Sequence, residues 1–217
     1  MSIRTQRDGS RARTPLRAET VARTALALVD SGGLESLTMR RLAASLEVQL
    51  PTLYRLFDNK QALLDEMAET LLAGVLARAD LTGDTWEERA AALARALRET
   101  LLAQRDGARV VGGTYTAQQA TLTLADTMLA ILGEAELPPE KALWAATTLF
   151  SYVLGEVLEQ QGATGGETEL LAASVRDGRY PRLAATPWER FVDFDARFDF
   201  GVRVLTAGLR AECARRP

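Results

Sequence analysis

Apolar residues recur at every third or fourth position along most of this chain, and this spacing limits its fold more than any other feature. Ala22, Ala25 and Leu26 begin one such series, and another runs from Phe198 to Leu209. Residues spaced in this way share one face of an α-helix, whereas a half-buried strand needs strict alternation, which no segment shows convincingly. Because 47% of the residues are hydrophobic, enough for a packed core, the chain is predicted to be all-α.

Capping residues divide the N-terminal part into four predicted helices. Thr14-Pro15 predicts the start of the first, because proline suits the first helical position, and Gly32-Gly33 predicts its end. A short second helix is predicted to begin at Thr38, and a third carries Pro51 in its first turn. Asn59 is expected to cap a fourth helix that runs to about residue 75.

The rest of the chain is also predicted to be helical. Thr85 and Glu88 have the spacing of a capping box, which predicts a helix that continues to about Gln104. The apolar spacing predicts further helices over 105–111, 117–133, 139–161 and 195–213. The glycine-rich segment 162–168 is predicted to be a flexible loop.

Basic residues are concentrated near the beginning of the chain. Residues 1–60 contain ten Lys and Arg against six Asp and Glu, although the whole chain has a net charge of −3. Residues 1–13 are polar and contain four arginines, so they are predicted to form a disordered basic arm. This distribution predicts that only the N-terminal part contacts a polyanion.

The chain contains no histidine and one cysteine, Cys213. The lack of histidine excludes Ser-His-Asp and Cys-His catalytic groups and the HExxH zinc site. No Gly-rich phosphate loop or nucleophile elbow is present either, so an enzyme is disfavoured. One cysteine excludes an intrachain disulfide and favours a reducing cytoplasm. Neither a secretion signal nor an uninterrupted apolar run of roughly 18 residues is found.

The second and third predicted helices are short and separated by a tight break, as in a helix-turn-helix unit. In the third, Leu53 and Phe57 share the inner face by their i, i+4 spacing, which leaves Thr52, Tyr54, Arg55 and Leu56 facing outward or obliquely. An exposed short helix with these side chains, beside a basic arm, suits contacts to DNA phosphates and base edges.

The segment "LTMRRLAASLEVQLPTLYRLFDNKQALLDEM" resembles the DNA-binding region of the TetR (tetracycline repressor) family. "QRDGARVVGGT" (104–114) and "LGEVLEQQ" (154–161) resemble the regulatory core of the tetracycline repressors themselves. The resemblance implies a basic arm, a three-helix DNA-binding domain, a connecting helix and loop, and a helical effector-binding and dimerisation domain. The expected bounds are 1–13, 14–60, 61–83 and 84–217.

The resemblance implies DNA contacts from residues of the helix-turn-helix unit and the start of the fourth helix. These are Thr38, Arg40, Gln49, Leu50, Pro51, Thr52, Tyr54, Arg55, Leu56 and Lys60. Lys60 would hold a phosphate beside a helix N-terminus, which itself attracts anions; without the resemblance, it is a solvated surface lysine. Leu50, Arg55 and Leu56 replace a glutamine, a tryptophan and a histidine of the tetracycline repressors, so a different operator is expected.

The resemblance also implies an effector pocket in the C-terminal domain. Its expected residues are Leu76, Leu93, Leu97, Val111, Thr114, Tyr115, Thr127, Ile131, Trp144, Ser151 and Glu159, of which Tyr115, Ile131 and Trp144 fit ordinary core equally well. Leu76, Val111 and Ser151 stand where the tetracycline repressors have histidines. A magnesium ion would then be held mainly by Glu159, and one carboxylate rarely makes a tight magnesium site. We therefore expect a largely apolar effector and neither a metal nor another cofactor.

Two apolar stripes fit the four-helix bundle through which the family dimerises, although such stripes alone also fit plain core. They comprise Phe150, Val153, Leu154, Val157, Leu158, Phe198, Val202, Leu205 and Leu209. The resemblance thus implies a homodimeric repressor that binds a palindromic operator and is released by a small molecule. The alternatives are an effector-independent DNA-binding regulator, and a carrier or enzyme on the same fold.

Overall fold

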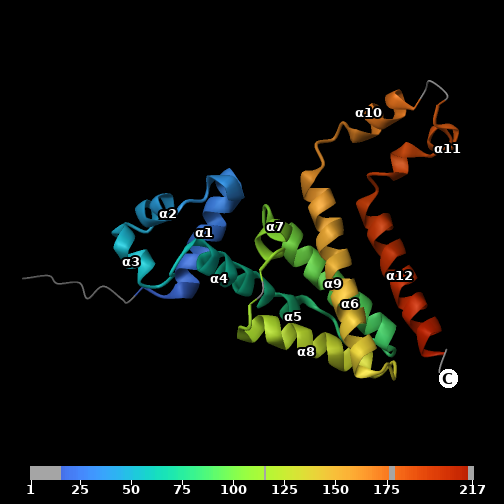
Figure 1. Cartoon of the computed structure of the whole chain (residues 1–217), viewed down its shortest axis with the longest axis horizontal. Helices are drawn as coiled ribbons and strands as arrows, with labels where there is room; N and C mark the ends of the chain where they lie inside the picture. Colours follow the sequence, from blue (N-terminus) through green and yellow to red (C-terminus); the bar gives the residue numbers. More distant parts are fainter. Residues whose placement is uncertain (1–15, 115, 176–178, 215–217) are drawn as a thin grey trace, which may run out of the picture.

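The computed structural model describes residues 16–114, 116–175 and 179–214, and these residues form helices joined by turns, with no strand among them (Figure 1). The N-terminal helices are α1 (Ala18–Gly32), the 3-10 turn η1 (Leu34–Ser36), α2 (Met39–Ser45), α3 (Leu50–Tyr54) and α4 (Lys60–Leu72). The central ones are α5 (Val75–Arg78), α6 (Trp86–Leu102), α7 (Gly107–Val111), α8 (Gln119–Gly133) and α9 (Pro139–Gly162). They are followed by α10 (Glu167–Ser174), α11 (Pro181–Ala184), η2 (Trp188–Arg190) and α12 (Phe194–Cys213).

The predicted caps form where the sequence placed them. Thr38 accepts a hydrogen bond from the Arg41 backbone N–H, and Asn59 accepts one from Ala62. Thr85 and Glu88 make both bonds of a capping box at the start of α6. These contacts satisfy backbone donors that have no partner inside the helix. The all-α prediction is confirmed.

Three predicted boundaries are wrong. α1 begins at Ala18, because Arg17 has extended dihedral angles, while Thr14 and Pro15 lie outside the described residues. The fourth helix ends at Leu72, and α5 starts only after Gly74.

The third wrong boundary concerns the expected loop at 162–168, because α10 already begins at Glu167. The Glu167 carboxylate accepts hydrogen bonds from the Thr164 hydroxyl and from the backbone of Thr164 and Gly165. Chiefly the bond from the Thr164 hydroxyl lowers the pKa of Glu167 to about 2. A carboxylate held in this way at a helix N-terminus favours the first turn of α10.

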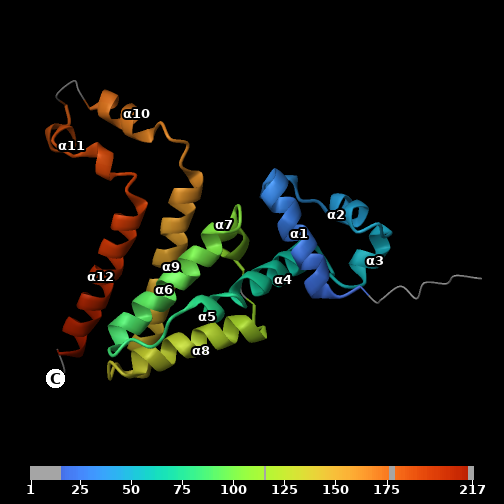
Figure 2. The ribbon, with the colours of Figure 1, turned by 180° about the vertical axis from the view of Figure 1, so that it is seen from behind.

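The helices pack around separate cores in two parts of the molecule (Figure 2). The head comprises α1, α2, α3 and the first half of α4, and its core includes Leu63 and Met67. This head core therefore extends beyond residue 60, the expected end of the DNA-binding domain. The body comprises the helices from α5 onward, with the last turns of α4 packed against them.

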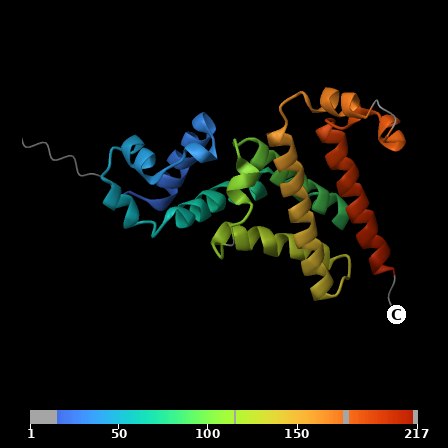
Figure 3. The same cartoon turned by 45° about the horizontal axis from the view of Figure 1, so that its top comes forward.

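Long helices give the body its shape. α9 lies against α6, α8 and α12, and α9 and α12 run side by side (Figure 3). In the chain, α10 and α11 come between these two helices, and they lie at the end of the pair where α9 ends and α12 begins. No described helix is long and apolar enough to cross a membrane.

Candidate nucleic-acid interface and effector cavity

The short helix α3 is fixed to the head by its inner face. Leu53 is fully buried and Phe57 is 4% exposed, whereas Tyr54 is 48% exposed and Leu56 is 38% exposed. Arg55 is exposed on the same outer side. The predicted inward and outward directions in this helix are confirmed, and α3 presents aromatic, basic and aliphatic side chains to solvent.

The turn between α2 and α3 holds the two helices at a set angle. Glu47 has a left-handed backbone, with φ of 53°, and Val48 donates a backbone hydrogen bond to Ala43 at 3.0 Å. Pro51 occupies the first turn of α3, where its missing N–H costs nothing. This local geometry is that of a helix-turn-helix unit with an exposed second helix.

The ten residues expected to contact DNA lie in this part of the head. Leu50 and Thr52 are half-buried, and the remaining eight are exposed: Thr38, Arg40, Gln49, Pro51, Tyr54, Arg55, Leu56 and Lys60. Arg40, Arg55 and Lys60 form no ion pair with any residue of the described ranges. Lys60 is the first residue of α4, directly after the Asn59 cap. These cations are therefore available for an external anion.

The body contains a cavity of about 450 Å³ between α6, α8 and α9, and Leu72 of α4 forms part of its wall. Aliphatic side chains form most of its wall, and its polar atoms come from four threonines and the backbone. The lining includes Leu93 and Leu97 of α6, Leu124 and Met128 of α8, and Phe150 and Val153 of α9. The threonines are Thr114, Thr116, Thr121 and Thr147. Such a site suits a mostly apolar small molecule with a few hydrogen-bonding groups.

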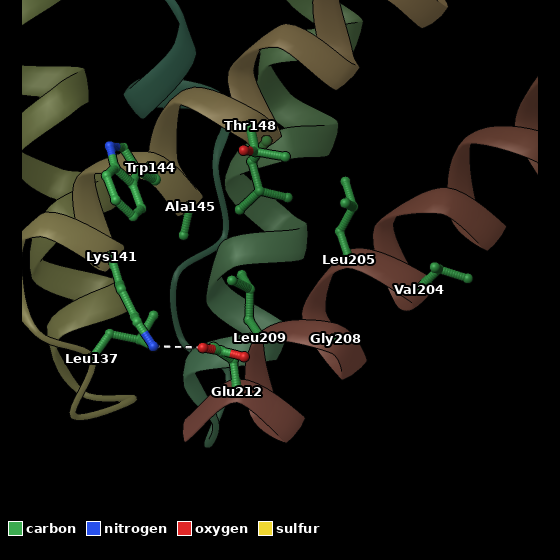
Figure 4. A pocket seen from close by; sticks show the side chains of 11 residues that line it. Leu137, Lys141, Trp144, Ala145, Thr148, Val204, Leu205, Gly208, Leu209 and Glu212 are labelled. Atoms are coloured by element: carbon green, nitrogen blue, oxygen red, sulfur yellow. Dashed lines mark hydrogen bonds and ion pairs between the residues drawn. The ribbon is translucent and has the colours of Figure 1, made fainter. Parts of the chain in front are cut away.

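A second hollow, of about 380 Å³, lies on the surface between α9 and α12 (Figure 4). Trp144 and Thr148 face it from α9, and Val204 and Gly208 face it from α12. An ion pair between Lys141 and Glu212 spans one end of it. This groove exposes apolar surface, since Trp144 is 57% exposed and Val204 is 52% exposed.

The comparisons with known proteins agree with this geometry. The family model for the bacterial regulatory proteins of the TetR family matches residues 22–67, which make up most of the head. The model for the tetracyclin repressor-like C-terminal domain matches residues 79–213, which make up the body. The chain belongs to the TetR family.

Individual TetR-family proteins match over almost their whole length. The tetracycline repressor protein class A from transposon 1721 of Escherichia coli is 37% identical, over 90% of this chain and 91% of the repressor. The crystal structure of a possible TetR family transcriptional regulator from Streptomyces coelicolor A3(2) is 44% identical with a TM-score of 0.81, and covers 90% of this chain and 99% of that one. The structure of ActR from Streptomyces coelicolor in complex with actinorhodin is 28% identical with a TM-score of 0.83, over 92% and 98% of the two chains.

The residues expected from the TetR resemblance to form the effector pocket are not all brought together. Leu93, Leu97, Val111 and Thr114 line the cavity, and Tyr115 lies outside the described residues. Leu76 and Ile131 pack into the body core, and Thr127 bonds to the Thr123 carbonyl within its own helix. Ser151 and Glu159 are exposed on α9, and Trp144 lines the surface groove instead.

The residues expected at a dimer interface are divided in the same way. Val153, Val157, Phe198 and Val202 are each at most 2% exposed in the core of this chain, so they have almost no surface left for a partner. Phe150, Leu154, Leu205 and Leu209 are half-buried against cores of the same chain. Of the nine expected interface residues, only Leu158 is exposed. Phe200 and Val204, which were not among the expected residues, are exposed as well.

A polar contact between head and body was not found from the sequence. Gln104, at the end of α6, donates to the Leu26 carbonyl at 3.1 Å and to the Asp30 carboxylate at 2.6 Å. Asp106 accepts a hydrogen bond from the Leu34 backbone at 2.8 Å, and Arg109 pairs with Glu35. We call these contacts the head–body latch. The motif "QRDGARVVGGT" marks the segment, but its partners lie more than 70 positions away in the sequence.

Proposed function

We propose that this TetR-family chain is a transcriptional repressor that binds a near-palindromic operator as a homodimer and leaves it when an apolar effector enters the body. The observation that carries the proposal is the outer face of α3, where Tyr54 and Arg55 are exposed. Arg55, Arg40 and Lys60 of the same head form no ion pair within the part of the chain that the structure describes. In a dimer, two such helices would enter successive major grooves, roughly 34 Å apart. The proposal places the protein with the DNA in the cytoplasm and assigns it no catalysis.

The ten head residues divide into two roles in this proposal. Lys60, Thr38 and Tyr54 hold phosphates in this proposal, since they are exposed where α4 begins, at the cap of α2 and at the end of α3. Arg55, Leu50 and Leu56 read bases, since arginine pairs with guanine and leucine contacts thymine methyl groups. The remaining residues, Arg40, Gln49, Pro51 and Thr52, complete the contact surface at the N-terminal ends of α2 and α3.

The test begins with selection of bound sequences from random duplex DNA, followed by salt titration of the recovered duplex. Lys60→Ala should weaken all duplexes equally and reduce the salt slope by about 0.9, the value for one phosphate contact. Arg55→Ala should instead relax the choice of one base pair. The matched control is Arg78→Ala, an exposed arginine of α5 outside this surface. No enriched sequence, or a sequence-selective loss at Lys60, would contradict the proposal.

The cavity supports a largely apolar effector that binds without a metal ion. Its described lining contains hydroxyl and backbone oxygens but no carboxylate, and magnesium is usually held through carboxylates. Glu159, the carboxylate among the expected pocket residues, is exposed on α9 and does not line the cavity. A largely apolar compound, such as a polycyclic natural product, fits this lining better than a metal-chelated tetracycline.

Release from the selected operator is measured with a panel of largely apolar polycyclic compounds and with tetracycline, each with magnesium or with chelator. We expect release by a member of the panel, independent of chelator, and little effect of tetracycline. Release by tetracycline only in the presence of magnesium would show that the cavity has been misread. If no compound of a broad panel alters DNA binding or thermal stability, the protein is an effector-independent regulator. Turnover or a tightly held ligand without any DNA binding would indicate a carrier or enzyme.

The dimer is proposed to form through the exposed faces of α9 and α12. Leu158, Phe200 and Val204 are each about half exposed or more, and the groove beside Trp144 continues the same apolar surface. Two such helix pairs can bury this surface against each other as a four-helix bundle. Native mass spectrometry at micromolar concentration should show a dimer without DNA. Val204→Glu should shift it to monomer, and a monomeric wild type would contradict this part of the proposal.

A further inference from the structure

The helix α4 belongs to both parts of the molecule. Leu63 and Met67 are buried in the head core, whereas Ala68 and Leu72 are buried in the body core. Leu72 also lines the cavity, and Lys60 lies at the opposite end of the helix, roughly 18 Å away at 1.5 Å per residue. A change at the cavity end of α4 therefore reaches the proposed phosphate contact through one continuous helix.

Glu69, one turn before Leu72, ties α4 to the first turn of α8. Its carboxylate accepts hydrogen bonds from the backbone N–H groups of Ala120 and Thr121 and from the Thr121 hydroxyl, the last at 2.8 Å. Gln118, the N-cap residue of α8, gives no side-chain cap. Glu69 thus takes the place of the missing cap and puts a negative charge at the positive end of the helix.

The residue that Glu69 holds also lines the cavity. Thr121 faces it together with Thr116, and the two hydroxyl oxygens are 2.8 Å apart. An effector that accepts a hydrogen bond from the Thr121 hydroxyl competes with Glu69 for the same proton. An effector that merely fills this end displaces the first turn of α8, and the carboxylate follows its donors.

We infer that Glu69 is the positioning residue through which the state of the cavity sets the position of α4, and with it the head. The inference rests on the proposed DNA-binding function and adds the route by which the effector acts. Coupling between two sites is reciprocal, so binding of the operator must in turn alter the first turn of α8. This consequence can be measured before the natural effector is known.

The experiment measures amide hydrogen exchange over residues 116–124, in the full-length protein with and without the selected operator duplex. The readout is the ratio of the free to the bound exchange rate. In the wild type we expect these amides to exchange about five-fold or more slowly with the operator bound, because one site typically changes the other at least five-fold. Glu69→Gln keeps the shape of the side chain and removes its charge, and should bring the ratio close to one.

The matched control is Glu66→Gln, which removes the same charge from the same helix. Among the described residues, the Glu66 carboxylate has no hydrogen-bond or ion-pair partner, so its ratio should equal that of the wild type. A merely structural role of Glu69 would speed exchange equally in the free and the bound protein and leave the ratio unchanged. That result would overturn the inference.

A second pair of variants serves if Glu69→Gln does not fold or does not bind the duplex. Thr121→Val removes one of the three hydrogen bonds and should lower the ratio, whereas Thr121→Ser keeps the hydroxyl and should restore it. Equal ratios in both variants would overturn the inference, as would a wild-type ratio of one. If the wild type binds no duplex at all, the proposed function fails first, which is a distinct result.

Discussion

Replacing Gln104 by alanine tests whether the head–body latch stabilises the fold. Gln104 is 6% exposed, and its side chain donates hydrogen bonds to two groups of α1, the Leu26 carbonyl and the Asp30 carboxylate. A bond to a charged group contributes about 1.5–3 kcal/mol and a neutral one about 1 kcal/mol. Asp30 is exposed and keeps a bond from the Arg105 backbone at 2.9 Å, so the charged bond is screened and counts at the low end. The expected loss is about 2.5 kcal/mol, the low-end charged bond and the neutral bond together.

The loss is measured by urea unfolding of wild type and Gln104→Ala at equal protein concentration, because the stability of a dimer depends on concentration. Gln119→Ala, an exposed glutamine in the first turn of α8, is the control and should change the free energy of unfolding by less than about 0.5 kcal/mol. If Gln104→Ala changes it by no more than this control, the latch does not stabilise the contact between head and body.

Two further variants test the turn before α7 and the burial of a phenol. In Gly107→Ala the new Cβ would lie 2.2 Å from the Leu101 carbonyl oxygen, so the free energy of unfolding should fall by about 1–3 kcal/mol; Gly133→Ala, which meets nothing within 4 Å, should not cause this fall. Burial raises the pKa of Tyr152 from 10.0 to about 12. Because the folded protein then holds the phenol proton more tightly than the unfolded chain, the stability from this proton is complete below pH 10 and is lost as the pH rises toward 12. Urea unfolding between pH 9 and 12 should therefore show a smaller alkaline decline for Tyr152→Phe, and an equal decline would contradict this assignment.

Local sequence signals predicted most of the head correctly. Thr38, Asn59 and the Thr85–Glu88 box act through hydrogen bonds to N–H groups three residues away, so a short stretch of sequence contains both partners. The buried and exposed sides of α3 follow from helical spacing in the same way. The exposed surface of α3 was therefore largely predictable from the sequence, whereas its contacts with DNA stay predictions.

The body was harder to predict, because most of its helices carry apolar residues on more than one face. On α9, Val153 and Val157 face the core of the same chain, while Leu158 is exposed one position later. Spacing shows that a stripe is apolar, but it does not show whether the same chain or a partner covers it. The Glu69 and Gln104 contacts join positions more than 50 residues apart, beyond the reach of local pattern reasoning.

Lys60 is expected to have opposite effects on the stability of the fold and on DNA binding. A cation in the first turn of α4 opposes the helix dipole by about 0.3–1 kcal/mol, although the Asn59 cap and the buried Leu63 and Met67 keep the helix formed. If Lys60 binds a DNA phosphate, reversing its charge should have opposite effects on the free energy of unfolding and on operator affinity. Lys60→Glu should raise the free energy of unfolding by about 0.5 kcal/mol or more, and it should reduce operator affinity more than Lys60→Ala does. Urea unfolding and salt-dependent operator titration measure the two effects. Loss of stability in Lys60→Glu, or unchanged operator affinity, would show that this lysine serves the free fold.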